Sequence, residues 1–291
     1  LIGAALITGW DWRAIFWFLV IGGGFSFTLN LVMLPETSRN VVGNGSIKPR
    51  SVINRAPILH VPSVKKNWRL EDPDISTRTE TKKGLDLLAP FRIMSKPEIY
   101  ICLSAQAIHF SMWTLVLTSI TTQLTKEYNY SVMKIGLCYL PSGIFGLLGS
   151  MSSGRILDWN YRRQFAKFQK AIDDGKIPPK TTFNIVKTRV QIAVPFILVA
   201  DGFTLMFGWC IDKHASIATI LVSSILVSFG CMAVIGVNTT LLIDLYPDSG
   251  SVATSSINFT RCIHGAVFVA ALASMNKHMG IGGTFTLMFG L

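Results

Sequence analysis

Six long apolar stretches limit how this chain can fold. Each has about the 20 residues that a helix needs to cross a bilayer, and none alternates with the period of two that barrel strands show. Half of the 291 residues are hydrophobic and 15% are charged, against about 25% charged in soluble domains. The chain is therefore predicted to be an all-α, polytopic membrane protein embedded in a lipid bilayer. The predicted spans cover residues 14–34, 99–124, 135–152, 190–211, 216–243 and 252–275.

The basic residues between the spans predict how the chain is oriented. Segments 35–96 and 153–189 carry twelve and nine Lys and Arg residues, whereas the connections on the other side carry five. Basic loops stay on the cytoplasmic side of a membrane, so both segments are predicted to be cytoplasmic. Because the net charge of +11 is concentrated in these loops and not on a folded basic surface, nucleic acid is not expected as a partner.

The sequence has no arrangement of residues typical of an enzyme. It has no nucleophile–base arrangement, no Walker loop for phosphates and no paired carboxylates at a useful spacing. The five cysteines lie in apolar runs and lack the spacing of metal ligands. We therefore predict a protein that is not an enzyme and that holds neither a metal ion nor an organic cofactor.

Polar side chains inside the predicted spans are candidates for a substrate or proton path. An ionised group at the centre of a bilayer costs at least about 2.5 kcal/mol, so such groups usually face a bundle interior or a watery cavity. For the amides, hydrogen bonding between helices is the structural alternative. The candidates are Gln106, His109, Asp201, Asn238, Asn258 and Arg261.

Arg261 is the most costly of these side chains to place in a membrane. Helical spacing puts it on one face with Thr254, Asn258 and Gly265, and the glycine would let a neighbouring helix approach closely. This face is predicted to point into the bundle. Asp201 is the only carboxylate deep within a span. It is a candidate counter-charge to Arg261 that holds the fold, or a proton carrier.

Two further patterns concern local packing. Gly143, Gly146 and Gly149 are predicted to lie on one side of their helix and to support tight contact with a neighbour. Segment 84–94, GLDLLAPFRIM, spaces apolar residues among polar ones. We interpret it either as a short helix in the membrane surface or as a simple linker.

Three motifs resemble those of the major facilitator superfamily. Segment 154–163, GRILDWNYRR, resembles the signature between helices 8 and 9 of that family, although Trp159 replaces the usual basic residue and Tyr161 the usual glycine. Segment 34–39, LPETSR, is similar to the motif that follows helix 6, and segment 241–266 resembles the helix 10–11 region of the fungal drug:proton antiporter branch. The matching residues are Gly154, Asp158, Arg162 and Arg163 in the first motif, Pro35, Glu36 and Arg39 in the second, and Asp244, Tyr246, Pro247, Asn258 and Arg261 in the third.

This resemblance implies how the chain is divided. Residues 1–34 would hold the end of helix 5 and helix 6, and residues 35–96 the cytoplasmic central loop. Residues 97–291 would hold helices 7 to 11 and the start of helix 12. The N-terminal helices of the family are missing from this sequence, so an incomplete chain is expected, with those helices as its partner.

The resemblance also implies a function. It implies export of drugs or other small organic molecules by alternating access, with the proton gradient as the driving force and the plasma membrane favoured over the vacuolar one. The charged motif residues would form a cytoplasmic gating network in which Asp158 and its neighbours pair with Asp244 and Glu36. The alternatives are a sugar-like nutrient uptake carrier of the same superfamily, and a membrane scaffold or receptor that transports nothing. The network would comprise Gly154, Asp158, Arg162, Arg163, Glu36, Arg39 and Asp244.

Overall fold

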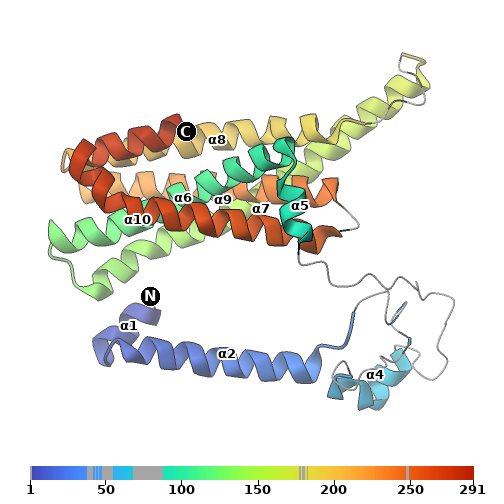
Figure 1. The fold of residues 1–291 in the computed structure, drawn as a ribbon, viewed down its shortest axis with the longest axis horizontal. Coiled ribbons are helices and arrows are strands. Elements are labelled where there is room, and N and C mark those ends of the chain that lie inside the picture. Colours follow the sequence, from blue (N-terminus) through green and yellow to red (C-terminus); the bar gives the residue numbers. More distant parts are fainter. Residues whose placement is uncertain are drawn as a thin grey trace. The chain divides into compact units, whose positions relative to one another are not determined.

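The structure is a computed structural model, and it describes residues 2–37, 42, 44, 46–47, 55–67, 88–176, 178, 181, 183–246 and 249–291. Six of the described helices are long and apolar enough to cross a membrane, and they coincide with the six predicted spans. This agreement confirms the all-α class. The elements are α1 (Ile2–Gly9), α2 (Arg13–Met33), η2 (Pro57–His60), α4 (Pro62–Asn67), α5 (Ala89–Met94), α6 (Pro97–Lys126), α7 (Val132–Asp173), α8 (Ile185–Asp212), α9 (Ile217–Leu245) and α10 (Gly250–Gly290) (Figure 1).

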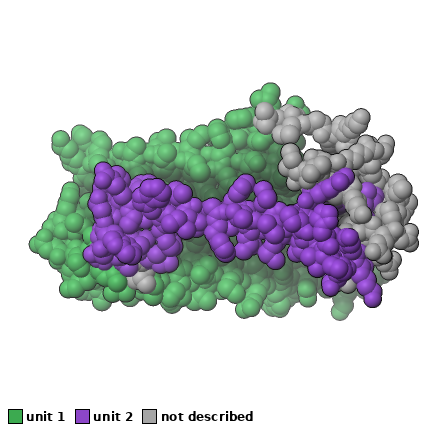
Figure 2. Space-filling model, turned by 90° about the horizontal axis from the view of Figure 1, so that it is seen from below, with its two compact units in different colours: residues 1, 87–291 green, residues 2–86 purple. Residues whose placement is uncertain are grey.

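The chain divides into two compact units, residues 2–86 and residues 87–291 (Figure 2). In the first unit α1 packs against α2, and the Trp12 N–H in the turn between them donates to Asp11 Oδ1 at 2.8 Å. No residue of α2 is buried, although the helix is largely apolar. A helix of this composition needs lipid or other helices around it, as expected of a membrane span.

The second unit is a bundle of the long helices α6 to α10, with the short α5 at one end (Figure 1). Helix α9 lies against α6, α7 and α8, while α10 lies against α6 and α8. Consecutive long helices run in opposite directions, so α7 and α9 end where α6, α8 and α10 begin. We call this end of the bundle the basic end, because it is flanked by the segments rich in Lys and Arg, and the other the opposite end.

Two glycines allow α7 to lie close to α9. A Cβ atom at Gly149 would lie 2.3 Å from the Phe229 carbonyl oxygen, and one at Gly146 would lie 3.3 Å from Met232 Cγ. At Gly143 nothing lies within 4 Å of the Cβ position. The predicted contact is therefore confirmed for Gly146 and Gly149 and wrong for Gly143, because each step of three residues turns away by about 60° on a helix with 3.6 residues per turn.

Gly149→Ala is expected to destabilise the bundle by about 1–3 kcal/mol, the usual range for overpacked sites. The new methyl group would meet the backbone of Phe229, which cannot swing aside as a long side chain can. Thermal unfolding of the purified full-length transporter that contains this chain measures the effect. Gly143→Ala is the matched control on the same helix, and equal unfolding temperatures for the two variants would contradict the α7–α9 contact.

Helix α7 is longer than the sequence predicted. The expected loop 153–189 is helical up to Asp173 and again from Ile185. Good helix formers follow residue 160, and the rings of Tyr161, Phe165 and Phe168 pack around Phe183, with centroids 5.6, 5.6 and 5.4 Å from it. A single ring from the short connection thus anchors the last turns of α7.

Helix α10 bends sharply at Gly280, where φ is +72°, a backbone conformation that favours glycine. The helical segment after the bend begins with the N–H groups of Ile281 and Gly282, which donate to Asp212 Oδ1 at 3.1 and 3.3 Å. It packs on α8, where the rings of Phe207 and Phe285 meet edge to face at 5.2 Å.

The short helix α5 packs on the basic end of the bundle. The rings of Phe91 and Phe259 lie 5.2 Å apart, and the Ser256 hydroxyl of α10 donates to the Pro90 carbonyl oxygen at 3.1 Å. Residues 89–94 are therefore helical and held against α10, which favours the helix over the linker in our interpretation of segment 84–94. Leu85 lies outside the described residues.

Candidate functional site

Arg261 lies midway along the first part of α10, beside α6. Its Nη2 atom donates to Asn258 Oδ1 at 2.8 Å, and its guanidinium carbon lies 4.7 Å from the centre of the Phe110 ring. A Cβ atom at Gly265 would lie 3.3 Å from that ring, so the glycine gives Phe110 its space. The Nε atom of Arg261 is buried without a hydrogen-bond partner in the described structure. The structure thus brings Asn258, Arg261 and Gly265 together on one face, as predicted.

Asp201 of α8 contacts His109 of α6 and not Arg261. The His109 Nε2 and Asp201 Oδ1 atoms are 3.5 Å apart, and their side chains are 9% and 20% exposed. Within the described ranges no ion pair joins Asp201 to Arg261. The prediction that Asp201 is the counter-charge of Arg261 is therefore wrong. The reason is geometric: the guanidinium is held on its own helix by Asn258 and over an α6 ring.

The remaining mid-span amides differ in their surroundings. Gln106 Nε2 donates to the Thr239 hydroxyl at 2.9 Å, which ties α6 to α9. This contact fits the structural alternative of a helix–helix hydrogen bond. Asn238 is half-buried on the neighbouring position of α9.

The basic end holds a partly buried ion pair that the sequence did not indicate. Arg189 at the start of α8 donates from Nη2 and Nε to Asp244 Oδ2 of α9, at 2.7 and 3.1 Å. Arg189 is 6% exposed, and its guanidinium carbon lies 5.4 Å from the centre of the Tyr161 ring of α7. In the sequence, Arg189 stands immediately before an apolar span. This position indicated only the last basic residue of a loop, and not an ion pair.

The motif residues on α7 do not form the expected network with Asp244. Gly154, Asp158, Arg162 and Arg163 are all exposed, and in the described part of the chain Asp158 makes no ion pair. Arg163 stacks on the Trp159 ring at 5.4 Å. Asp244 pairs with Arg189 instead, which corrects the expected pairing between Asp244 and the charged residues of α7.

The other motif residues, from segment 34–39, belong to the first unit. Glu36 is half-buried there. Arg39, like Pro247 of the third motif, lies outside the described residues.

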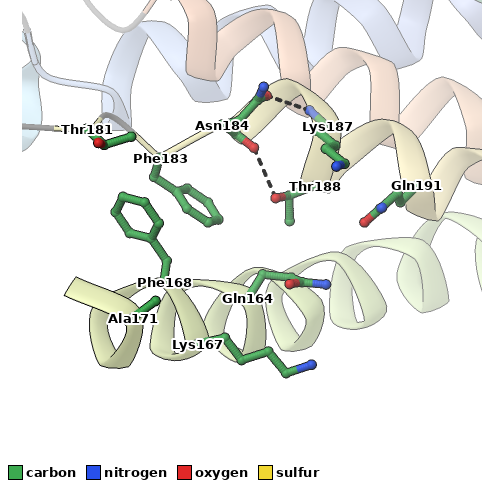
Figure 3. Close-up of a pocket in the computed structure, with 10 residues that line it drawn as sticks. All are labelled: Gln164, Lys167, Phe168, Ala171, Thr181, Phe183, Asn184, Lys187, Thr188 and Gln191. Carbon is green, nitrogen blue, oxygen red and sulfur yellow. Dashed lines mark hydrogen bonds between the residues drawn. The ribbon is translucent and has the colours of Figure 1, made fainter. Parts of the chain in front are cut away.

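A pocket of about 470 Å³ lies between the last turns of α7 and the start of α8 (Figure 3). Asn184 caps α8 by accepting from the Lys187 N–H at 2.9 Å. None of the candidate side chains predicted from the sequence lines this pocket. Its lining residues are Gln164, Lys167, Phe168, Ala171, Thr181, Phe183, Asn184, Lys187, Thr188 and Gln191.

The sequence matches a family model described as Major Facilitator Superfamily over residues 1–269. Multidrug transporter AQR1 of Candida glabrata is 42% identical over 292 residues, which cover 100% of this chain and 49% of that protein. Quinidine resistance protein 1 of Saccharomyces cerevisiae is 42% identical over 308 residues, covering 99% and 54%. MFS antiporter QDR2 of Candida albicans is 42% identical over 292 residues, covering 100% and 57%. The chain therefore spans about half the length of these curated relatives.

Proposed function

The chain belongs to the Major Facilitator Superfamily, and from that premise we propose that it is part of a proton-coupled exporter of drugs or other small organic molecules. The family consists of membrane transporters and not of enzymes. One relative is named as a multidrug transporter and another as an antiporter, which favours transport over a scaffold or receptor. The name of one relative refers to quinidine, so quinidine is the first compound to test.

In this proposal α2 takes the place of helix 6, and α6 to α9 take the places of helices 7 to 10. Helix α10 is helix 11 up to Gly280, and residues 281–290 begin helix 12. The earlier helices would come from the further length that the relatives have. Alternating access would then rock the α6–α10 bundle against those helices around a central site.

Arg261 with Asn258 is the observation that carries the proposal. An ionised side chain in the middle of a span is rare and usually marks a substrate or ion pathway. Asn258 is exposed and Arg261 is half-buried on this bundle, so both side chains retain polar atoms that a substrate could contact. The Arg261 Nε atom also has no partner among the described residues, so it is a further donor that a substrate could use.

The basic end supplies the gate in this proposal, and it would face the cytoplasm as its Lys and Arg content predicts. The Arg189–Asp244 pair would fix the ends of α8 and α9. The exposed Asp158, Arg162 and Arg163 on α7 would pair with helix ends of the other half when the gate closes. Loss of those contacts would open the cytoplasmic side.

Efflux from yeast cells tests the proposal. Cells with the full-length transporter in the plasma membrane should retain less quinidine than cells without it, and a protonophore should remove the difference, because collapse of the gradient removes the driving force. Cells that carry an empty vector are the control. Higher quinidine content in expressing cells would contradict export and favour the uptake carrier, while efflux that persists with the protonophore would contradict proton coupling.

A further inference from the structure

A buried histidine and a half-buried aspartate from different helices face each other in the middle of the bundle. His109 of α6 and Asp201 of α8 lie close to the centres of their helices, with Nε2 and Oδ1 3.5 Å apart. Both atoms are buried, and neither has a hydrogen-bond partner in the described part of the chain. A buried polar atom without a partner is costly, so this arrangement needs an explanation.

The other ring nitrogen of His109 fixes where its proton lies. Nδ1 is 2.7 Å from the Ala105 carbonyl oxygen one turn earlier. Because a carbonyl oxygen only accepts, Nδ1 must carry a hydrogen. A neutral His109 therefore presents the lone pair of Nε2 to Asp201. If Asp201 is ionised as well, two acceptors face each other with no hydrogen between them.

From this geometry we infer that His109 and Asp201 together form a binding site for a single proton. In the loaded site the proton lies between Nε2 and Oδ1, as imidazolium with carboxylate or as imidazole with carboxylic acid. On release it passes to water on the exposed side of Asp201, and two unshared electron pairs are left facing each other. The loaded site draws α6 and α8 together, and the empty one pushes them apart. The inference rests on the proposed function, for which it supplies the proton site.

Among the described residues, His109 and Asp201 form an ion pair only with each other. Arg261 is held by Asn258 and Phe110, and the short α5 brings only its Arg92, at the basic end. Cys231 of α9 lies within electrostatic range of Asp201, but a thiol carries no charge near neutrality. Tyr139 donates its hydroxyl to the Leu117 carbonyl. The other titratable groups within the predicted spans are Tyr100 and Cys102 of α6, Cys138 and Tyr139 of α7, Cys210 of α8, Cys231 of α9, and Arg261, Cys262 and His264 of α10.

His264 shows what distinguishes His109. Its Nδ1 atom contacts the Thr260 carbonyl oxygen at 2.9 Å, which is the same bond to the residue four positions earlier. Its side chain is also partly buried, but no carboxylate of the described structure lies within ion-pair distance of it. The carboxylate is therefore what makes the His109 site able to hold a proton, and His264→Gln is the matched control.

Proton release on substrate binding tests the inference. Purified full-length transporter is placed in weakly buffered detergent solution with a pH-indicator dye, and quinidine adjusted to the same pH is added. The wild type and His264→Gln should release about one proton per transporter, because an antiporter binds its substrate after the proton leaves. Asp201→Asn and His109→Gln should release none, and unfolding temperatures close to that of the wild type show that both variants fold.

Each outcome has a separate meaning. Release by Asp201→Asn equal to that of the wild type would overturn the site while leaving proton coupling intact. Absence of release from the wild type would count against the proposed function itself. If the variants do not fold, ¹⁵N spectra of the wild-type histidine rings decide: the inference requires that His109 Nδ1 stays protonated while Nε2 titrates, and a bare Nδ1 would overturn it.

Discussion

Arg261→Ala is expected to lower the rate of quinidine transport by the full-length protein severely without reducing the amount of transporter in the membrane. The change removes a charge-assisted hydrogen bond to Asn258 and a cation–π contact with Phe110. A hydrogen bond to a charged group contributes about 1.5–3 kcal/mol, and each 1.4 kcal/mol is a factor of about ten. If these contacts are needed in the transporting state, the rate should therefore fall by roughly 10- to 150-fold or more. Efflux rate and surface abundance, measured on the same cells, check the prediction.

Two companion variants show whether position or charge alone matters at Arg261. Arg261→Lys keeps the charge but loses the planar guanidinium, so it should recover only part of the rate. Thr254→Ala lies on the same face one turn from Asn258, and its hydroxyl bonds only to the Gly250 carbonyl in the described structure, so it should transport at the wild-type rate. Normal efflux by Arg261→Ala would remove Arg261 from the transport path.

Asp244→Ala is expected to destabilise the transporter by about 3 kcal/mol, the lower end of the range for breaking a buried ion pair. Arg189 would be left 6% exposed with no acceptor for Nη2 and Nε. The lower end applies because the Asp244 side chain is 31% exposed, and solvent weakens the pair. Thermal unfolding of the purified full-length protein measures the change as a lower unfolding temperature.

A double variant separates the missing partner from general damage at the basic end. Arg189→Met with Asp244→Leu removes both charges, so it should recover most of the lost stability. The control is Lys176→Ala, which breaks an exposed pair with Asp174 at 3.1 Å and should change stability by less than about 1 kcal/mol. A double variant as unstable as Asp244→Ala would contradict the assignment of the cost to an unpaired Arg189.

The membrane spans could be predicted from the sequence because length and apolar content alone determine them. The face shared by Asn258 and Arg261 could also be predicted, since both residues lie on one helix and the period of 3.6 fixes their relation. The same periodicity wrongly placed Gly143 at the contact with α9, because this residue turns away from the contact face within two turns of the helix. Relations within a helix are therefore readable, to the accuracy of the helical repeat.

Contacts between helices could not be predicted in this way. Asp201 is 92 residues from His109, the difference between the two residue numbers, and periodicity gives no register between α8 and α6. The role of Arg189 in an ion pair could not be predicted for a different reason. A basic residue beside a span is normally interpreted as a charge of the cytoplasmic loop. Only the fold reveals that it reaches Asp244. The extension of α7 was missed because its anchor, Phe183, lies across the connection to α8.

The coupling of quinidine to protons tests the central proposal most directly. The full-length transporter is reconstituted in liposomes that contain a pH-sensitive dye, and a quinidine gradient is imposed, with protein-free liposomes to correct for diffusion of this weak base. The account predicts that protons cross the membrane in the direction opposite to quinidine, so the pH of the lumen changes by more than in protein-free liposomes. Asp201→Asn should abolish this additional pH change. Quinidine movement carried by the transporter with no accompanying pH change would contradict it.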